Sequence, residues 1–288
     1  LGVDHIIHPE VETAHAVAHL VRQSSASYAF EFEDGKIQII GVRLDRKSPI
    51  INAPLANVST YKDEHLRIVA VERNHQTIIP DGTTILLPGD QVFAVCDHDY
   101  VRDFLKMAGK QQTQADNVMI MGGGLVGQSI ARHLQNEANI KIIEGDHHKA
   151  ECAAELLPNA LIIHGDGLDI QLLQEEGLSD MDAFVAVTGD DENNILSSLL
   201  ARHYNVPQSI ALVNKLDYLS VIPQLGVDSV VSRQLLTVNA VEHLIQSEIA
   251  DIATPPGMDA QLIEFIAERH SKITKRPLMK IRFPRNAI

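Results

Sequence analysis

Six short apolar runs recur between residues 117 and 231, and polar or helix-favouring stretches separate them. The runs are residues 117–121, 140–144, 160–164, 183–187, 209–213 and 228–231. Each is a nearly continuous apolar stretch, which is typical of a strand that is covered on both faces in a parallel sheet. The pattern therefore predicts six buried parallel strands in this part of the chain.

Helical patterns fill the spaces between these runs, at residues 125–137, 147–156, 169–176, 191–204 and 218–224. Strands that alternate with helices predict an α/β fold, here a doubly wound Rossmann-type parallel sheet of about 120 residues. Ligands of such sheets bind at the carboxyl ends of the strands. Candidate site residues are therefore expected where each apolar run ends.

A glycine-rich turn follows the first run and leads into a helical pattern. It consists of Gly122, Gly123, Gly124, Leu125, Val126 and Gly127. In a G-x-G-x-x-G turn the first glycine permits the sharp bend, the second lets the backbone approach a pyrophosphate, and the third lets the helix pack closely. The N–H groups at the helix start are donors for phosphate. An isolated match is often only a tight turn, but this strand-to-helix context predicts a dinucleotide site.

A carboxylate stands where a ribose ligand is expected. Glu144 ends the second apolar run, at the spacing of about 20 residues that follows the glycines in dinucleotide-binding domains. A carboxylate there accepts hydrogen bonds from ribose hydroxyls and repels a 2′-phosphate, and residues 145–148 contain no arginine. The site is therefore predicted to prefer NAD, or an adenosine nucleotide such as ATP or ADP, over NADP. The alternative is that Glu144 is only a solvated strand end.

Three residues at the next strand ends complete the predicted site. Asp166 follows the third run, and Thr188 and Gly189 follow the fourth. Asp166 is expected either to contact an adenine edge or to cap the helix that opens near Asp169. Thr188 and Gly189 are expected to face the nicotinamide of a bound dinucleotide.

The rest of the chain has a different pattern. Residues 28–33, 37–44, 67–72, 84–86 and 91–96 are expected to be strands and residues 99–108 a helix. They predict a small α+β domain that is followed by a polar linker at residues 109–116. The tail from Met258 onward has the same order of features as the segment from Ser25 to Leu55, and it predicts the start of a second small domain.

The first 22 residues repeat a later part of the chain. Residues 1–22 and 225–246 align without a gap and share about nine identities, beginning with Leu-Gly-Val-Asp. The second copy closes the predicted parallel sheet, so the first copy predicts the end of an earlier domain of the same kind. The chain is accordingly expected to be a fragment of a longer protein.

Charge and hydropathy exclude some classes of partner. The net charge of −14 argues against binding to nucleic acid or to an anionic membrane surface, because both require clustered lysine and arginine. The apolar runs are far shorter than the ~18 residues that span a bilayer. A cytoplasmic location is expected.

These motifs together resemble the TrkA family of potassium-uptake regulators, whose chains carry two tandem RCK units. The resemblance rests on the glycine turn, on Glu144, and on residues 164–167, 187–194, 225–228, 79–82 and 87–90. The last two are the most specific, because a dehydrogenase has no need of them. The resemblance implies four segments: 1–24, the end of a first RCK N-terminal (nucleotide-binding) domain; 25–111, the first RCK C-terminal domain; 116–235, the second RCK N-terminal domain; and 250–288, the start of a truncated second RCK C-terminal domain.

The resemblance also implies a function. Such a chain would be a regulatory subunit that binds NAD, as NADH or NAD+, or ATP or ADP, and gates a membrane potassium channel or transporter subunit of the TrkH or TrkG type. It would be a homo-oligomer, either a dimer or a tetramer. It would be cytoplasmic and peripherally associated with the inner (plasma) membrane through the transporter.

One position departs from the family pattern. The family often has an arginine in the fifth strand, and this chain has Leu212 between Ala211 and Val213. The charge of a bound phosphate is therefore expected to be less compensated.

An NAD-dependent oxidoreductase is the alternative function. It would need an acid or base beside the nicotinamide. Only the isolated His164 and His203 are candidates, so no catalytic residue is predicted. His15 and His19 are four residues apart but lack a completing ligand, so no metal site is predicted.

Overall fold

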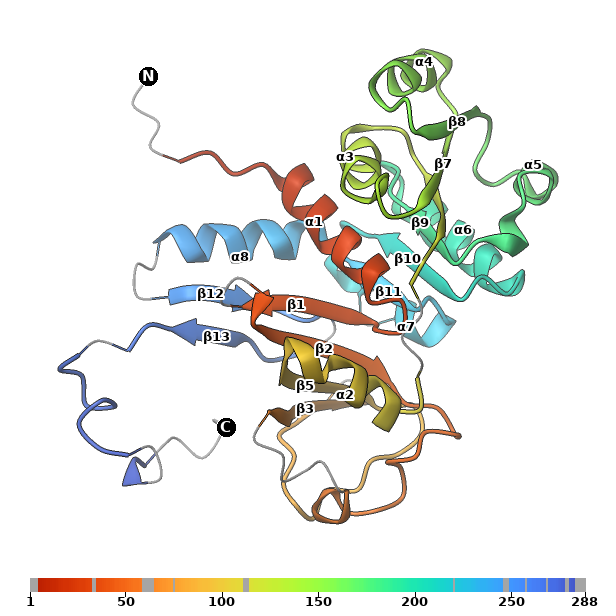
Figure 1. The fold of residues 1–288 in the computed structure, drawn as a ribbon. Coiled ribbons are helices and arrows are strands. Elements are labelled where there is room, and N and C mark those ends of the chain that lie inside the picture. Colours follow the sequence, from red (N-terminus) through yellow and green to blue (C-terminus); the bar gives the residue numbers. More distant parts are fainter. Residues whose placement is uncertain are drawn as a thin grey trace.

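The computed structural model describes residues 5–32, 35–58, 65–74, 76–110, 114–219, 221–245, 249–256, 258–267, 269–277 and 280–282. Its strands form sheets of six, five and two strands. Helix α1 (Pro9–Arg22) runs between the six-stranded sheet with its helices and the five-stranded sheet (Figure 1).

The six-stranded sheet is parallel, with the order β11-β10-β9-β6-β7-β8. Its strands are β6 (Asn117–Met121), β7 (Asn139–Glu144), β8 (Ala160–His164), β9 (Ala183–Ala186), β10 (Gln208–Leu212) and β11 (Ser229–Val231). The chain enters at β6, adds β7 and β8 on one side, and then adds β9 to β11 on the other. The predicted doubly wound sheet is confirmed, and its switch point lies between β6 and β9.

Helices connect these strands on both faces of the sheet. They are α3 (Leu125–Leu134), α4 (His147–Leu156), α5 (Ile170–Glu175), α6 (Asp191–His203) and α7 (Ile222–Leu225), with 3-10 turns η5 (Leu178–Asp180) and η6 (Leu216–Tyr218). The prediction of one helix over residues 218–224 is wrong. Pro223 cannot donate an N–H inside a helix but suits a first turn, and it lies in the first turn of α7.

The five-stranded sheet is antiparallel, with the order β1-β2-β5-β3-β4. It comprises β1 (Tyr28–Phe32), β2 (Ile37–Arg43), β3 (Leu66–Arg73), β4 (Gln76–Ile78) and β5 (Gln91–Asp97), with η2 (Leu55–Asn57), η4 (His98–Tyr100) and α2 (Val101–Met107). The predicted strand at residues 84–86 is wrong, since only Ile85 forms a bridge, to Pro54. This segment is held by turns instead, because Leu87 N–H donates to the Asp90 carboxylate at 2.8 Å.

The two copies of the sequence repeat both contain a helix at the same position. Helix α1 and helix α8 (Arg233–Ile245) start at equivalent residues and pack against each other. Helix α1 leads into β1, and α8 leads into the hairpin of β12 (Ile249–Ala253) and β13 (Leu262–Phe265). This hairpin begins before Met258, where the sequence placed the start of the tail segment. The first four residues of the upstream repeat copy lie outside the described residues.

Candidate functional site

Two of the motif glycines are required by the fold itself. Gly122 has a φ of +113°, which L side chains rarely adopt, and its N–H donates to Ile143 O at 2.9 Å. A Cβ on Gly127 would lie 1.9 Å from Gly122 O, so only glycine allows α3 to approach the turn this closely.

Gly124 is different, because the space around it is open. It is the N-cap residue of α3 with an extended backbone (φ −72°), and a Cβ there would meet nothing within 4 Å. No side chain of the described residues caps α3. Leu125 is 73% exposed and Val126 is buried, so these two residues can contribute only backbone N–H groups to an anion. The helix start therefore fits a pyrophosphate.

Gln128 holds the turn in place from the inside. Its side chain is buried on α3, and its Nε2 donates to Gly123 O at 2.8 Å. Sequence reasoning missed this residue. The available signal was a polar side chain on the otherwise apolar buried face of a helix, which needs a hydrogen-bond partner there.

Glu144 is fixed at the end of β7 by two backbone donors. Its Oε2 accepts from Gly123 N–H at 2.7 Å, and its Oε1 accepts from Asp146 N–H at 2.9 Å. Each carboxylate oxygen has a further lone pair. The carboxylate is therefore held beside the glycine turn with acceptor capacity left for ribose hydroxyls, as its predicted role requires.

A cleft of about 590 Å³ opens at the carboxyl ends of β6 to β9. Of the predicted site residues, Gly122, Glu144, Asp166 and Thr188 line it. Its other lining residues are Met121, Ile143, Gly145, His164, Gly165, Gly167, Leu168, Asp190 and Asn193. The remaining predicted residues do not line it: Gly123, Gly124, Leu125, Val126 and Gly127 form the turn and helix start next to Gly122, and Gly189 follows Thr188.

Asp166 does not cap a helix. Its Oδ1 accepts from Leu168 N–H at 2.9 Å within the loop. The N-cap of α5 is Asp169, which accepts from Gln171 N–H at 3.0 Å. The capping alternative for Asp166 is therefore wrong, and its exposed carboxylate faces the cleft.

The far wall of the cleft is held by Asn194, which is fully buried on α6. Its Oδ1 accepts from Thr188 N–H at 2.9 Å and from Thr188 Oγ1 at 2.7 Å. Its Nδ2 donates to Leu212 O at 2.9 Å. This one amide ties the ends of β9 and β10 to α6, so Thr188 is already satisfied within the protein.

The three acidic residues at the start of α6 have three different roles. Asp190 is the N-cap and accepts from Asn193 N–H at 2.8 Å. Asp191 is buried, and its carboxylate accepts from Asn214 N–H at 3.0 Å and from Lys215 N–H at 2.9 Å. Glu192 is exposed and pairs with Lys215 Nζ. The run Asp190-Asp191-Glu192 therefore forms the N-cap and first turn of α6, where negative charge is favourable, and Asp191 in addition fixes the loop after β10.

The described lining of the cleft carries carboxylates without a matching cation. Glu144, Asp166 and Asp190 line it, and no lysine or arginine among the described residues does so. Leu212 is buried in the core and contributes only its carbonyl. His164 contacts Gly145 O through Nε2 at 3.2 Å. The expected shortage of positive charge near the phosphates is thus a property of the whole cleft lining.

Helix α3, which begins at the glycine turn, is tied to α1 at its other end. Arg22 of α1 donates from Nε and Nη2 to the Glu137 carboxylate at 2.8 and 3.0 Å, and from Nη2 to His133 O at 3.1 Å. The hydrogen bond from Arg22 lowers the pKa of Glu137. The rings of His15 and His133 lie 4.3 Å apart, and burial lowers the pKa of His133. His15 therefore packs against α3, whereas His19 Nδ1 lies 3.2 Å from the Glu31 carboxylate of β1.

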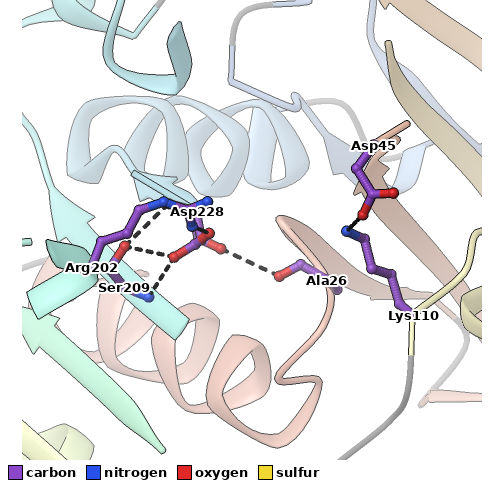
Figure 2. Close-up of polar contacts among 7 residues, drawn as sticks. Ala26, Asp45, Lys110, Arg202, Ser209 and Asp228 are labelled. Atoms are coloured by element: carbon purple, nitrogen blue, oxygen red, sulfur yellow. Dashed lines mark hydrogen bonds and ion pairs between the residues drawn. The ribbon is translucent and has the colours of Figure 1, made fainter. Parts of the chain in front are cut away.

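Polar contacts around the end of the parallel sheet include one that reaches Ala26, in the loop before β1 (Figure 2). Asp228 accepts from Ser209 N–H at 3.0 Å and pairs with Arg202, which fixes the strand that precedes α8. The adjacent Ser229 donates from Oγ to Ala26 O at 3.3 Å. Gln208 Nε2 donates to Leu20 O at 2.9 Å. The segment from α1 to β1 is thus anchored to the edge of the parallel sheet.

Comparison with known proteins identifies two domains in the chain. A family model described as the TrkA-N domain matches residues 118–233, and one described as the TrkA-C domain matches residues 39–109. The chain is 33% identical over 290 residues to the Trk system potassium uptake protein trkA homolog 1 of Methanosarcina mazei, covering 100% of this chain and 71% of that protein. It is 30% identical over 297 residues to the protein TrkA of Haemophilus influenzae, covering 100% of this chain and 64% of that protein.

Solved structures share this fold. The GsuK RCK domain superimposes with a TM-score of 0.59 at 17% identity, over 88% of this chain and 56% of that one. The GsuK channel bound to NAD superimposes with a TM-score of 0.57 at 18% identity, over 85% and 45% of the two chains. None of the described helices is long and apolar enough to cross a membrane. The chain spans about two thirds of the length of its sequence relatives, and it belongs to the family of Trk system potassium uptake proteins TrkA.

Proposed function

We propose that this chain is part of a nucleotide-binding regulatory subunit of a Trk-type potassium uptake system. The observation that carries the proposal is the glycine turn, where Gly122 and Gly127 are required by packing but Gly124 is left open. A purely structural turn has no need of a glycine at position 124, whereas a turn that receives a pyrophosphate does.

Residues in and beside the cleft would hold the parts of a dinucleotide such as NAD. The start of α3 would bind the pyrophosphate, Glu144 the adenine ribose, and Asp166 the adenine edge. Thr188 and Gly189 would face the nicotinamide. These roles are inferred from position, since strand ends in a doubly wound sheet converge on one ligand. ATP or ADP would use the same adenosine and phosphate contacts.

We also retain the domain boundaries expected from the sequence as part of the proposal. Residues 1–24 would end a first RCK N-terminal domain, and 25–111 would form its C-terminal partner. Residues 116–235 would form the second nucleotide-binding domain, and 250–288 would begin its C-terminal partner. The TrkA-C model at residues 39–109 supports the second of these segments, and the TrkA-N model at residues 118–233 supports the third.

A route for regulation follows from the contacts of α3. A ligand at the amino end of α3 acts on the same rigid helix whose other end is held by Arg22 of α1. Helix α1 continues into β1 of the five-stranded sheet. A nucleotide that favours one packing of α1 on α3 over another would therefore shift the arrangement of the two domains. The receiver of this shift would be a membrane potassium transporter subunit of the TrkH or TrkG type, and the assembly a homo-oligomer on its cytoplasmic side.

The contacts in the cleft favour regulation over catalysis. Hydride transfer to a substrate needs a positioned acid or base near the nicotinamide. Thr188 is engaged by Asn194, and His164 contacts a backbone carbonyl on the adenosine side. We therefore propose that NAD acts as a ligand and that the chain is not an enzyme.

The test combines binding, transport and turnover in a Gly124→Val variant. The added side chain has room in the free protein, so the fold should persist, but it fills the pyrophosphate space and should weaken nucleotide binding at least 100-fold, equivalent to about 3 kcal/mol. Potassium uptake in cells lacking the intact protein should then lose its nucleotide response. Ala154→Val adds the same side chain at an exposed position of α4 outside the cleft and serves as the control.

Two results would contradict the proposal. Normal regulated uptake with the Gly124→Val protein would exclude control through this site. Saturable NADH oxidation by the purified wild-type protein with a defined substrate would favour the oxidoreductase alternative.

A further inference from the structure

We propose that this cleft ranks its ligands by charge, binding NAD+ more tightly than NADH, and NADH more tightly than ADP or ATP in the absence of a divalent cation. The inference rests on the proposed function, because it concerns the same nucleotide site. It goes further by naming which chemical form of the ligand the site selects.

Three carboxylates bring negative charge to the cleft. Glu144, Asp166 and Asp190 line one cleft, and each is held in place by a backbone N–H at 2.7 to 2.9 Å. These bonds fix the carboxylates at the strand ends, so they cannot swing away when an anion enters. Asp166 lies on the β8 side of the cleft and Asp190 on the β9 side, so the ligand passes between them.

The described residues that line the cleft include no lysine or arginine, so backbone dipoles supply the positive charge. The start of α3 offers N–H groups and a partial positive charge of about half an elementary unit. This suits a pyrophosphate diester but compensates little more. Lys215, which follows β10, pairs through its ammonium group with Glu192. Leu212 at the end of β10 is apolar and buried in the core, so it adds no charge.

The ligands differ in the charge that they bring to this environment. NAD and NADH share the pyrophosphate, but the oxidised nicotinamide ring carries a positive charge that the reduced ring lacks. ADP and ATP end in a phosphate monoester, so at neutral pH ADP carries about one negative charge more than NADH and ATP about two more. NAD+ therefore brings the least negative charge and ATP the most. Mg²⁺ bound to the phosphates removes most of this difference.

The expected spread is moderate, because Asp166 and Asp190 are exposed and therefore screened. At an effective dielectric constant between those of water and protein, one extra ligand charge near several carboxylates weakens binding a few-fold. NAD+ is expected to bind about 3-fold more tightly than NADH. It is expected to bind more tightly than ADP by a factor of about 10 or more. The spread should shrink as salt is raised from about 0.02 to 0.3 M, since the Debye length shortens.

The first experiment is calorimetric titration of the purified chain with NAD+, NADH, ADP and ATP, each with and without Mg²⁺. The expected order is NAD+, NADH, ADP, ATP, and Mg²⁺ should improve only the last two. ADP or ATP binding as tightly as NAD+ without Mg²⁺ would overturn the charge ranking while leaving nucleotide binding intact. Absence of binding by all four ligands would instead overturn the proposed function, and the ranking with it.

The second experiment removes two of the cleft charges without removing their hydrogen bonds. In the Asp166→Asn, Asp190→Asn double variant, each asparagine can still accept the backbone N–H through Oδ1. The ratio of NAD+ affinity to ADP affinity should fall at least 3-fold. The matched control is the Asp81→Asn, Asp169→Asn double variant, which has the same net charge.

The control residues copy the local roles of the cleft residues. Asp81 accepts from the N–H two residues ahead, as Asp166 does, and Asp169 is a helix N-cap, as Asp190 is. Neither control residue lines the cleft. An equal fall in the affinity ratio in both double variants would show that net charge alone acts and would overturn the local ranking.

Discussion

The two halves of the carboxyl edge of the parallel sheet use similar residues for opposite purposes. On the β6 to β8 side, Gly124 leaves an open space and Glu144 keeps acceptor capacity beside it. On the β9 to β10 side, Asn194 and Asp191 are buried and bonded to the chain on several sides. In the first, open half, hydrogen-bonding capacity remains unused beside the glycine turn, whereas in the second, closed half the buried polar side chains are bonded within the chain.

Polar residues at strand ends therefore do not by themselves mark a ligand site. What separates the two halves is whether the polar groups have already found partners within the chain. Substitutions in each half test this difference in bonding.

The largest effect is expected at Gly127, in the open half. The Gly127→Ala variant places a Cβ 1.9 Å from Gly122 O, so the turn or the helix must shift. Overpacking against backbone should lower the free energy of unfolding by about 3 kcal/mol or more. Urea unfolding followed by circular dichroism measures this loss. Gly124→Val in the same turn should lose only about 1 kcal/mol, because valine is a poorer N-cap than glycine, and equal losses in the two variants would break the distinction between packing and binding glycines.

The next effect is expected at Asp191, in the closed half. Asp191→Ala leaves the N–H groups of Asn214 and Lys215 without the charged acceptor that holds the loop after β10. The free energy of unfolding should fall by about 2 to 4 kcal/mol. Asp190→Asn, which keeps the neighbouring N-cap, should change it by less than about 0.5 kcal/mol. Nucleotide binding lost in Asp191→Ala without any loss of stability would place this residue in the open half instead.

Glu144 tests the open half directly. Glu144→Ala should weaken NAD binding by about 1 to 3 kcal/mol, because charge-assisted hydrogen bonds to the ribose are lost. Calorimetry with NAD and NADP on wild type and variant measures the effect. The variant should also discriminate less between the two ligands. Wild-type protein that binds NADP as tightly as NAD would show that Glu144 does not contact the ribose.

The smallest effect is expected at Glu192, on the surface of the closed half. Hydrogen bonds from Lys215 and then Tyr218 lower the pKa of Glu192 to about 2 from an ordinary value of 4.5. Because the folded pKa is depressed, the stabilisation is complete above pH 4.5 and is lost as the pH falls towards 2. The melting temperature of wild type should exceed that of Glu192→Gln slightly at pH 6, and the gap should close by about pH 2. Detection of an ordinary Glu192 pKa by NMR titration would contradict this.

The open half was largely predictable from the sequence, because its signals are local. The spacing of Gly122, Gly124 and Gly127 and the position of Glu144 at a strand end follow from one strand-turn-helix-strand unit. The parallel sheet followed from the apolar runs for the same reason. Whether these residues bind a nucleotide stays a prediction.

The closed half was not predictable, because its contacts join distant segments. The Asp191 carboxylate meets Asn214, 23 residues later, and Asn194 meets Leu212 O, 18 residues later. A run of three acidic residues gives no sign of which one turns inward. Asp166, in the open half, shows a different limit, because two aspartates stand near the start of α5 and the sequence does not show that Asp169 is the one that caps it. Gln128 was missed because its partner, Gly123 O, is a backbone atom.

The bond between Arg22 and Glu137 would couple the proposed nucleotide binding to the position of α1 in both directions. Coupling between two equilibria is reciprocal. If bound nucleotide changes the equilibrium constant for packing of α1 by some factor, displacement of α1 changes nucleotide affinity by the same factor. A transporter that holds α1 in one position would therefore set how much of the cellular nucleotide this domain captures. The transporter would then control nucleotide binding by the subunit that regulates it. Loss of the Arg22 contact would abolish this coupling in both directions.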